Sequence, residues 1–380
     1  MIILDNPYAS KELAEYLQET KIPVLKNDFS VSLSEQYNLN LKEDCEFGDM
    51  LNENGKLLTI SEHSLEWVYK NLKDPEKINA IRLMKHKTAA REILKPLYPD
   101  FFFTEAKITD LRHLNFNALK KPFVLKPAVG FFSVGVYTIF NETSWENALN
   151  EIDRNFQQMK GGYPEDVIGN AEFILEEYIT GEEYAIDAYY DESGKAVILN
   201  ILKHEFGSAT DVSDRLYYTS KEIIKSMLLP FSDFLNEANK FFRVKNFPLH
   251  IEVRVSGKKI VPIEFNPLRF AGWCTTDLSY FAYGIKTYDY FLNAKKPGWN
   301  ELLKEKDSKI YSLILLNKAP GCDNSTLNYE ALKNKFSKVL NLRKTEGSYP
   351  VFGFLFTETN SSDRAELDYI VRADLTEFLI

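Results

Sequence analysis

The sequence predicts an α/β protein. Short apolar segments typical of strands alternate with amphipathic segments typical of helices, over most of the 380 residues. Hydrophobic residues make up 44% of the chain and charged residues 27%, which is the usual balance of a globular protein. At roughly 100–200 residues per domain, this length allows two or three domains.

The first 75 residues predict a small α/β unit. Ser10 is placed to cap a helix whose Leu13, Ala14 and Leu17 form an apolar stripe. No Gly-x-Gly-x-x-Gly turn follows the first strand, so we do not expect a dinucleotide site. The predicted strands are 2–4, 22–25 and 57–60, and the predicted helices are 11–19 and 64–72.

The middle of the chain predicts further strands and helices. The capping box Thr143–Glu146 begins a helix, and a long polar loop runs from His204 to Ser220. The predicted strands are 123–126, 136–140, 173–178, 184–190, 250–255 and 260–265, and the helical stretches are 76–95, 146–158 and 221–242.

The last 80 residues predict a small α/β tail. Its strands are 309–316 and 352–357, and its helices are 329–339 and 364–378. Within the last helix, Tyr369-Ile370-Val371 suits a strand equally well.

Composition limits the partners and the location. The net charge of −9 argues against nucleic acid, because phosphate backbones are held by basic surfaces. No run of about 18 apolar residues predicts a membrane span, and the N-terminus lacks the pattern of a signal peptide. Cys45, Cys274 and Cys322 form no metal or disulfide pattern. We therefore expect a cytoplasmic protein.

The hairpin at residues 250–267 carries a possible metal site. Glu252 and Glu264 lie on its two arms, and Asn266 shares a strand face with Glu264. Carboxylate and amide oxygens are hard ligands that suit Mg²⁺. The alternative is a pair of acids that face solvent on an edge hairpin.

Two other segments could bind a nucleotide. Lys126 ends a strand before a loop with Gly130, Ser133 and Gly135, whose backbone N–H groups can turn toward phosphate oxygens. An ordinary hairpin loop is the alternative. Downstream, Glu176 and Glu177 end an apolar strand, where backbone groups can contact an adenine edge, and a later carboxylate can bind ribose hydroxyls. Here a charged loop is the alternative.

These motifs, in this order and spacing, resemble the ATP-grasp superfamily between about residues 80 and 290. The resemblance implies an N-terminal pre-ATP-grasp domain at 1–80, an ATP-grasp domain at 81–300 with a lid at about 122–178, and a C-terminal extension at 301–380. It further implies ATP and Mg²⁺, or Mn²⁺ in its place, as cofactors. The implied nucleotide-binding residues are Lys87 (with Lys85 as a competitor), Lys126, Ser133, Glu176, Glu177, Ile179 and Glu183, and the implied metal ligands are Glu252, Glu264 and Asn266.

Within the superfamily, His250-x-Glu252 and Glu264-x-Asn266-Pro267 are similar to carboxylate–amine ligases, especially L-amino-acid (dipeptide) ligases. That similarity implies that a carboxylate attacks ATP to give an acylphosphate and ADP, and that an amine then displaces phosphate. Arg269, Arg254 and His250 are the catalytic candidates that would stabilise the intermediates. Arg269 stands one place beyond the usual arginine because Leu268 intervenes, and Arg254 has a structural ion pair as its alternative.

The motifs say less about the residues that bind the carboxylate and amine substrates. The loop 204–218 is the candidate specificity element, in which Asp211 or Asp214 could hold an amine and Arg215 a carboxylate; a solvated loop with packed tyrosines is the alternative. We expect Cys274 to be a small buried residue. The implied partners are small-molecule carboxylates and amines, amino acids first, and a homodimer is possible. Alternative functions are an ATP-grasp carboxylase or carbamoyl-phosphate-type enzyme and a non-catalytic nucleotide-binding protein.

Overall fold

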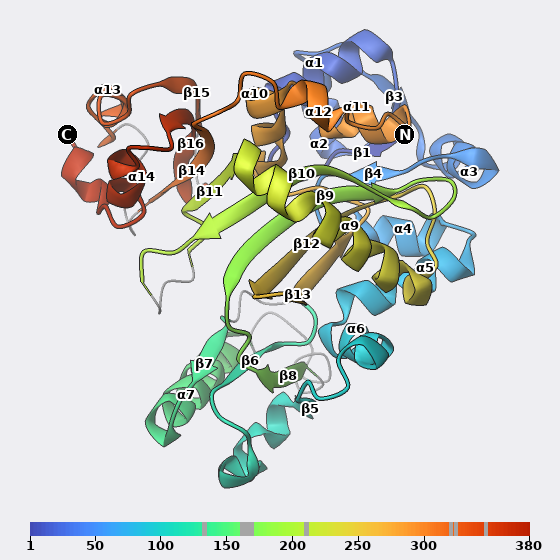
Figure 1. The fold of residues 1–380 in the computed structure, drawn as a ribbon. Helices are drawn as coiled ribbons and strands as arrows, with labels where there is room; N and C mark the ends of the chain where they lie inside the picture. Colours follow the sequence, from blue (N-terminus) through green and yellow to red (C-terminus); the bar gives the residue numbers. More distant parts are fainter. Residues whose placement is uncertain (131–134, 160–170, 209–212, 319–321, 323–325, 346–348) are drawn as a thin grey trace. The chain divides into compact units, whose positions relative to one another are not determined.

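The structure is a computed structural model that describes residues 1–130, 135–159, 171–208, 213–318, 322, 326–345 and 349–380. It divides into two compact units (Figure 1). Unit 1 comprises Met1–Ile78 and Glu182–Ile380, and unit 2 comprises Asn79–Gly181. The helices and strands confirm the predicted α/β class. The domain limits predicted at residues 80 and 300 stay predictions.

Unit 1 begins with a four-stranded parallel sheet in the order β3-β2-β1-β4. Ser10 caps α1 as predicted, since its side chain accepts the N–H of Leu13 at 3.3 Å. The prediction missed α2, β3 and α3, which are short or only weakly amphipathic. The elements are β1 (Ile2–Ile3), α1 (Lys11–Thr20), β2 (Pro23–Leu25), α2 (Asp28–Ser34), β3 (Asn40–Lys42), α3 (Asp44–Asn54), β4 (Leu58–Thr59) and α4 (Leu65–Asn71).

A second sheet of eight antiparallel strands forms the centre of unit 1, in the order β13-β12-β9-β10-β11-β14-β16-β15. The strands of the C-terminal residues continue this sheet through the pairing of β14 with β11. The strands are β9 (Glu182–Tyr190), β10 (Ala196–Glu205), β11 (Leu216–Ser220), β12 (Phe247–Ser256), β13 (Lys259–Pro267), β14 (Lys309–Asn317), β15 (Val339–Lys344) and β16 (Val351–Asn360).

The two faces of β9 have different neighbours. One face packs on α9 (Lys221–Phe242), where Tyr190 donates its hydroxyl to the carbonyl of Leu235 and Tyr184 contacts Phe231 (Figure 1). On the other face, Tyr189 contacts Phe291 of α11 (Thr287–Leu292) with ring centroids 5.7 Å apart. This second face also carries the polar residues described below.

Several boundaries in unit 1 differ from the prediction. The polar loop is shorter, because β10 extends to Glu205 and β11 begins at Leu216. The helix predicted at 329–339 ends at Lys333, because the chain then enters β15 to pair with β16. The helix predicted at 364–378 divides into α14 and a 3₁₀ turn, Leu375–Phe378. The remaining helices are α10 (Leu278–Tyr283), α12 (Trp299–Leu302), α13 (Tyr329–Lys333) and α14 (Ala365–Ile370).

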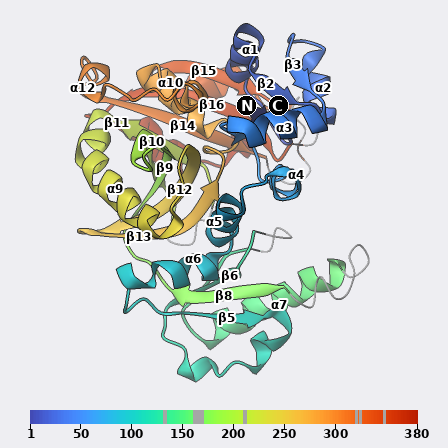
Figure 2. The same ribbon diagram turned by 90° about the vertical axis from the view of Figure 1, so that its right-hand side faces the viewer.

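Unit 2 is a four-stranded antiparallel sheet in the order β5-β8-β6-β7, packed on α7 (Figure 2). Trp145 and Leu149 of α7 lie in one apolar core with Phe123 and Leu125 of β6. The elements are β5 (Phe103–Lys107), β6 (Phe123–Pro127), β7 (Tyr137–Ile139), α7 (Glu142–Met159) and β8 (Glu172–Glu177), preceded by α6 (Lys87–Leu94) and by α5 (Pro75–Lys85), which begins in unit 1.

Two predictions in unit 2 are wrong in detail. The helical stretch 76–95 is broken at His86, which has an extended backbone and caps α6. The capping box of α7 starts at Asn141 instead of Thr143, because Asn141 and Ser144 each accept the other's backbone N–H. In both cases a side-chain acceptor completes the first turn of the helix. β5 was not predicted.

Among the described residues, no helix has the length and apolar character needed to cross a membrane.

Candidate functional site

The hairpin of β12 and β13 places the predicted metal ligands together. Glu252 lies directly opposite Glu264, and His250 lies directly opposite Asn266. Directly opposite residues of an antiparallel pair project to the same face, so the three ligands share one face of the sheet. Asn266 is buried, and both glutamates are half-buried. This set of two carboxylates and one amide fits the oxygen coordination that Mg²⁺ prefers.

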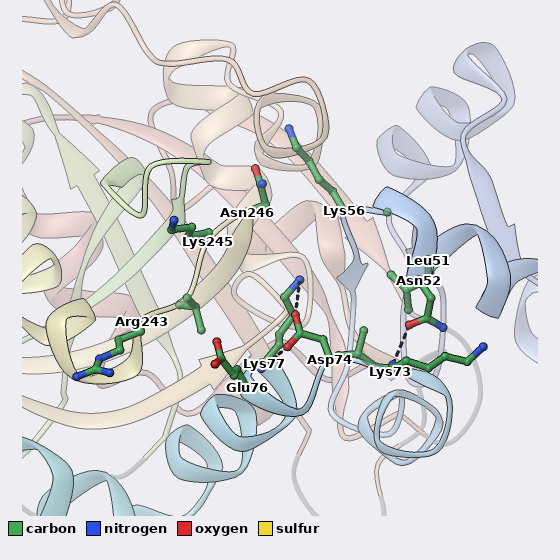
Figure 3. A pocket seen from close by; sticks show the side chains of 13 residues that line it. Leu51, Asn52, Lys56, Lys73, Asp74, Glu76, Lys77, Arg243, Lys245 and Asn246 are labelled. Atoms are coloured by element: carbon green, nitrogen blue, oxygen red, sulfur yellow. Dashed lines mark hydrogen bonds and ion pairs between the residues drawn. The ribbon is translucent and has the colours of Figure 1, made fainter.

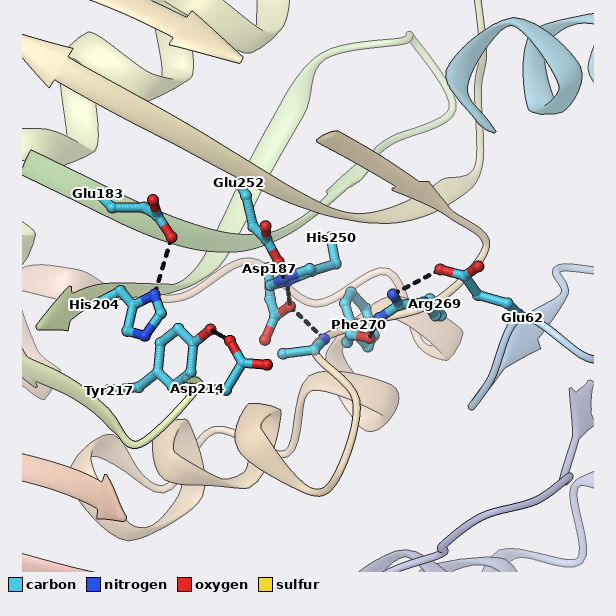
Figure 4. Close-up of polar contacts among 11 residues, drawn as sticks. Glu62, Glu183, Asp187, His204, Asp214, Tyr217, His250, Glu252, Arg269 and Phe270 are labelled. Carbon is cyan, nitrogen blue, oxygen red and sulfur yellow. Dashed lines mark hydrogen bonds and ion pairs between the residues drawn. The ribbon is translucent and has the colours of Figure 1, made fainter. Parts of the chain in front are cut away.

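His250 is held by an aspartate that the prediction missed. Its Nδ1 lies 2.9 Å from Oδ1 of Asp187 on β9, and its Nε2 lies 3.6 Å from Oε1 of Glu252 (Figure 4). Burial opposes the imidazolium form, but the carboxylates of Asp187 and Glu252 outweigh burial and raise the pKa of His250 to about 9. The two carboxylates therefore favour the protonated form of His250.

Glu183 sits further along the same face, between two basic side chains. Arg254 donates to its Oε2 at 3.0 Å, and His204 Nδ1 lies 2.9 Å from its Oε1. Burial would raise the pKa of Glu183, but these two partners outweigh burial and lower it. The structure thus brings Arg254 and Glu183 into one ion pair, the arrangement named above as the alternative for Arg254.

Leu268 explains the displaced arginine. Its backbone is left-handed, with φ +63°, and its N–H and C=O bond to Pro248 and Thr59 at 2.8 and 2.7 Å. The residue that follows, Arg269, turns toward the N-terminal part of unit 1. There it donates to Glu62 at 3.0 Å (Figure 4). The left-handed turn at Leu268 thus accommodates the one additional residue between Pro267 and Arg269, at the end of β13.

Asp214, a predicted substrate-binding residue, is the described candidate that the loop between β10 and β11 contributes to this face. Tyr217 donates its hydroxyl to Asp214 at 2.7 Å, and its ring stacks on His204 with centroids 4.2 Å apart (Figure 4). Arg215 instead donates to the carbonyl of Ala373 at 2.7 Å, in the C-terminal part of the chain. Asp211 lies outside the described residues.

Unit 2 holds a second group of predicted residues around a buried carboxylate. Glu176 accepts from Lys126 and from Arg91, each at 2.7 Å. All three side chains are buried. Arg91, which the prediction missed, lies one helical turn after Lys87 on α6. Since two cations surround one anion, these three residues carry one net positive charge.

The other nucleotide-binding candidates of unit 2 lie near the buried group around Glu176 or outside the described residues. Lys87 begins α6, and its backbone N–H donates to Ala128 at 2.7 Å. Glu177 contacts Lys120 at 3.2 Å, and its backbone N–H bonds to Phe102. Ile179 follows β8 and is half-buried. Ser133 lies outside the described residues, as does the centre of the loop 128–135. Lys85, the competitor of Lys87, is buried on α5.

One further cluster contains ligand-type side chains. His86, Glu105 and Glu172 place their nearest ligand atoms within 4.8 Å of one another. His86 Nδ1, however, accepts the backbone N–H of Ala89 at 3.4 Å to cap α6. Its Nε2 lies 3.1 Å from Oε2 of Glu172. This contact is a hydrogen bond that fixes the start of α6.

Two of the cavities in unit 1 differ in how they lie relative to the predicted residues. The larger, of about 520 Å³, contains basic side chains beside Asp74 and Glu76, and none of the predicted site residues lines it (Figure 3). Its basic residues are Lys56, Lys73, Lys77, Arg243 and Lys245. The smaller, of about 50 Å³, lies against residues 270–274, which follow the proposed metal strand.

Cys274 lines the smaller cavity but is buried, as expected. Burial raises the pKa of its thiol well above the usual range, so the nucleophilic thiolate is scarce.

We expect iodoacetamide at pH 8 to label exposed Cys45 in the native protein and to leave Cys274 unlabelled, as measured by peptide mass spectrometry. Equal labelling of the two cysteines would contradict this prediction.

Known proteins support the assignment of the fold. Residues 119–277 match the ATP-grasp domain family. No curated protein sequence matches the chain. An L-amino acid ligase from Bacillus licheniformis is 16% identical, with a TM-score of 0.68, and the match covers 100% of this chain and 97% of that one. The N5-carboxyaminoimidazole ribonucleotide synthetase of Thermotoga maritima is 15% identical, with a TM-score of 0.63 and coverage of 100% and 98%.

A biotin carboxylase from Campylobacter jejuni is 12% identical, with a TM-score of 0.59 and coverage of 94% and 87%. At these identities the solved structures establish the fold, and the family match establishes the domain. Residues 119–277 therefore match an ATP-grasp domain, and the chain has the fold of these solved structures.

Proposed function

We propose that this protein is an ATP-dependent ligase that joins a carboxylate to an amine through an acylphosphate, with release of ADP and phosphate. One observation carries the proposal: in a chain with an ATP-grasp domain, Glu252 lies directly opposite Glu264, and Asn266 follows on the same face. Phosphoryl transfer needs positioning and charge neutralisation more than covalent chemistry from the protein, and a divalent cation held by these residues would supply both.

Glu252, Glu264 and Asn266 would hold Mg²⁺, or Mn²⁺ in its place. When bound, the metal would neutralise charge on the phosphate oxygens. His250 is buried beside these ligands, with its Nε2 3.6 Å from Oε1 of Glu252. We assign it, together with Arg269 and Arg254, to the stabilisation of the acylphosphate and the tetrahedral oxyanion. Both arginines have acidic partners, Glu62 and Glu183, that fix their positions.

The residues of unit 2 would hold the nucleotide phosphates. Lys126 belongs to a buried group with a net positive charge, which favours an anionic ligand. Lys87 and the loop that contains Ser133 are assigned to the same task. Glu177 and Ile179 are assigned to adenine. In unit 1, Glu183 is assigned to the ribose, where its lowered pKa keeps it ionised as a hydrogen-bond acceptor.

The substrates are proposed to be small molecules, with amino acids as the first choice for both carboxylate and amine. The net charge of −9 disfavours nucleic acid. A cytoplasmic location and a homodimer complete the proposal. The oligomeric state can be measured by analytical ultracentrifugation.

A screen of phosphate release tests the function. Mg-ATP is incubated with paired panels of carboxylates and amines, and products are identified by mass spectrometry. Amine-dependent formation of ADP, phosphate and an amide supports the ligase. Turnover that depends on bicarbonate would instead favour a carboxylase. Tight ATP binding without turnover would favour a non-catalytic nucleotide-binding protein.

A further inference from the structure

Two buried polar side chains lie opposite each other on adjacent strands of unit 1. Asp187 of β9 pairs in register with Asn200 of β10. Directly opposite side chains project to the same face, with Cβ atoms about 5 Å apart. Asp187 is 1% exposed and Asn200 is 0% exposed. The pair lies on the face that carries His250 and the proposed metal ligands.

Only half of the carboxylate of Asp187 is used within the chain. Its Oδ1 accepts from His250 Nδ1 at 2.9 Å and from the backbone N–H of Ala271 at 2.7 Å (Figure 4). Its Oδ2 is buried, and it has no hydrogen-bond partner among the described residues. The same holds for both polar atoms of the Asn200 amide. Such groups cost about 1–3 kcal/mol each when unsatisfied, so a ligand that bonds to both would recover much of that cost.

The chemistry of the pair selects a positively charged nitrogen. Oδ2 of Asp187 and Oδ1 of Asn200 are acceptors, and a carboxylate favours a cationic donor. A group that reaches so buried a place must be small, and an ammonium group is about the size of a water molecule. A neighbouring carboxylate also stabilises the protonated form of an amine, whereas an attacking amine must be unprotonated. The nitrogen bound here is therefore one that does not react.

We infer that Asp187 and Asn200 form the subsite for the non-reacting ammonium group of the acyl donor. The donor would then be an amino acid whose carboxylate is activated while its ammonium is held on β9 and β10. This inference rests on the proposed ligase function. It assigns two residues that the sequence motifs did not indicate, and it separates recognition of the donor from attack by the acceptor amine.

The test compares an amino acid with its des-amino analogue as acyl donor, in the full-length protein with Mg-ATP. The measured quantity is the ratio of their kcat/KM values. Asn200→Leu removes the amide at similar size, and Asp187→Asn keeps an acceptor for His250 and Ala271 while it replaces Oδ2 by a donor. We expect each variant to lower the ratio by about 10- to 100-fold. Because the ratio is taken within one variant, a general loss of activity cancels.

Ser312→Ala is the matched control. Ser312 is also fully buried, and its hydroxyl has no partner among the described residues, but it lies on β14 opposite Thr357. In the Ser312→Ala variant, the ratio of kcat/KM for the amino acid to kcat/KM for the des-amino analogue should stay within twofold of the wild-type value. If Asn200→Leu and Asp187→Asn also leave the ratio within twofold, the inference is wrong, and the pair holds no substrate nitrogen.

A binding measurement separates this inference from the function on which it rests. If the wild-type protein releases no phosphate with any donor and amine, the ligase proposal fails. Calorimetry then still compares amino acid with des-amino analogue. Binding that requires the ammonium and is weakened at least tenfold by Asn200→Leu supports the subsite. Equal binding of the two compounds, or no binding of the amino acid, overturns it.

Discussion

Replacing Glu264 by glutamine is expected to lower kcat by at least about 10²-fold, the size of effect seen when one preorganised charge-stabilising group is removed. The change keeps the size of the side chain and one oxygen, but it removes a negative charge from the pair that faces across β12 and β13. Hard divalent cations depend on that charge. The measurement is phosphate release as a function of Mg²⁺ concentration, in which the variant should need more metal and still reach a lower plateau.

The control for this experiment is Glu237→Gln. Glu237 is an exposed glutamate of α9 that pairs with Lys240 at 2.6 Å, away from the polar face. Its variant should keep the wild-type rate. Glu252→Gln should match Glu264→Gln, because the two carboxylates are opposite each other in register. If Glu264→Gln retained half of the wild-type rate, the metal assignment would be wrong.

Replacing Glu176 by glutamine is expected to destabilise unit 2 by about 3–5 kcal/mol, because it leaves Arg91 and Lys126 buried without their anion. Hydrogen exchange of the backbone amides of β6 and β8 measures this change within the unit itself. Asp153→Asn is the matched control, since Asp153 pairs with Arg112 at 2.6 Å on the surface of the same unit. An exposed pair of this kind contributes at most about 1 kcal/mol. If Glu176→Gln and Asp153→Asn lowered the stability of unit 2 equally, burial of the ion pairs of Glu176 would not explain the expected effect.

The buried group of Glu176, Arg91 and Lys126 also predicts that the stability of unit 2 depends on pH. Burial alone would raise the pKa of Glu176, but Arg91 and Lys126 outweigh burial and lower it from 4.5 to about 2. A carboxyl whose pKa is lower in the folded state stabilises that state above its unfolded pKa. This contribution is therefore complete above about pH 4.5 and is lost as the pH falls toward 2. The protection factors of β6 and β8 in wild type, which correct for the slowing of intrinsic amide exchange in acid, should fall over this range, and Glu176→Gln should lack that part of the change.

Long periodic elements of this fold could be predicted, and short ones could not. The helix 221–242 was predicted with the bounds that the structure shows, since its apolar positions recur over many turns. By contrast, β3 has three residues, and α2 has seven with one buried side chain. Elements of that length form because neighbouring strands and helices support them. A local sequence pattern cannot report this support.

The candidate site shows the same division. A short turn fixes the register of the metal hairpin, so Glu252, Glu264 and Asn266 could be placed on one face from the sequence. Arg91, Asp187 and Asn200 depend on partners in distant segments, and the prediction missed them. For Asp187 a signal was present, because strand alternation places it on the same face as Glu183. Its significance depends on the pairing of β9 with β12, which no local pattern predicts.

The pairing of β14 with β11 covers a sheet edge that β11 would otherwise expose. β11 has five residues, all buried, and β14 bonds along its whole length. A shortened protein that ended before β14 would present the backbone of β11 as an open edge. Open edges of this kind recruit strands from other molecules. Laboratory versions trimmed to the recognisable ATP-grasp motifs would therefore tend to aggregate, even though every proposed catalytic residue was still present.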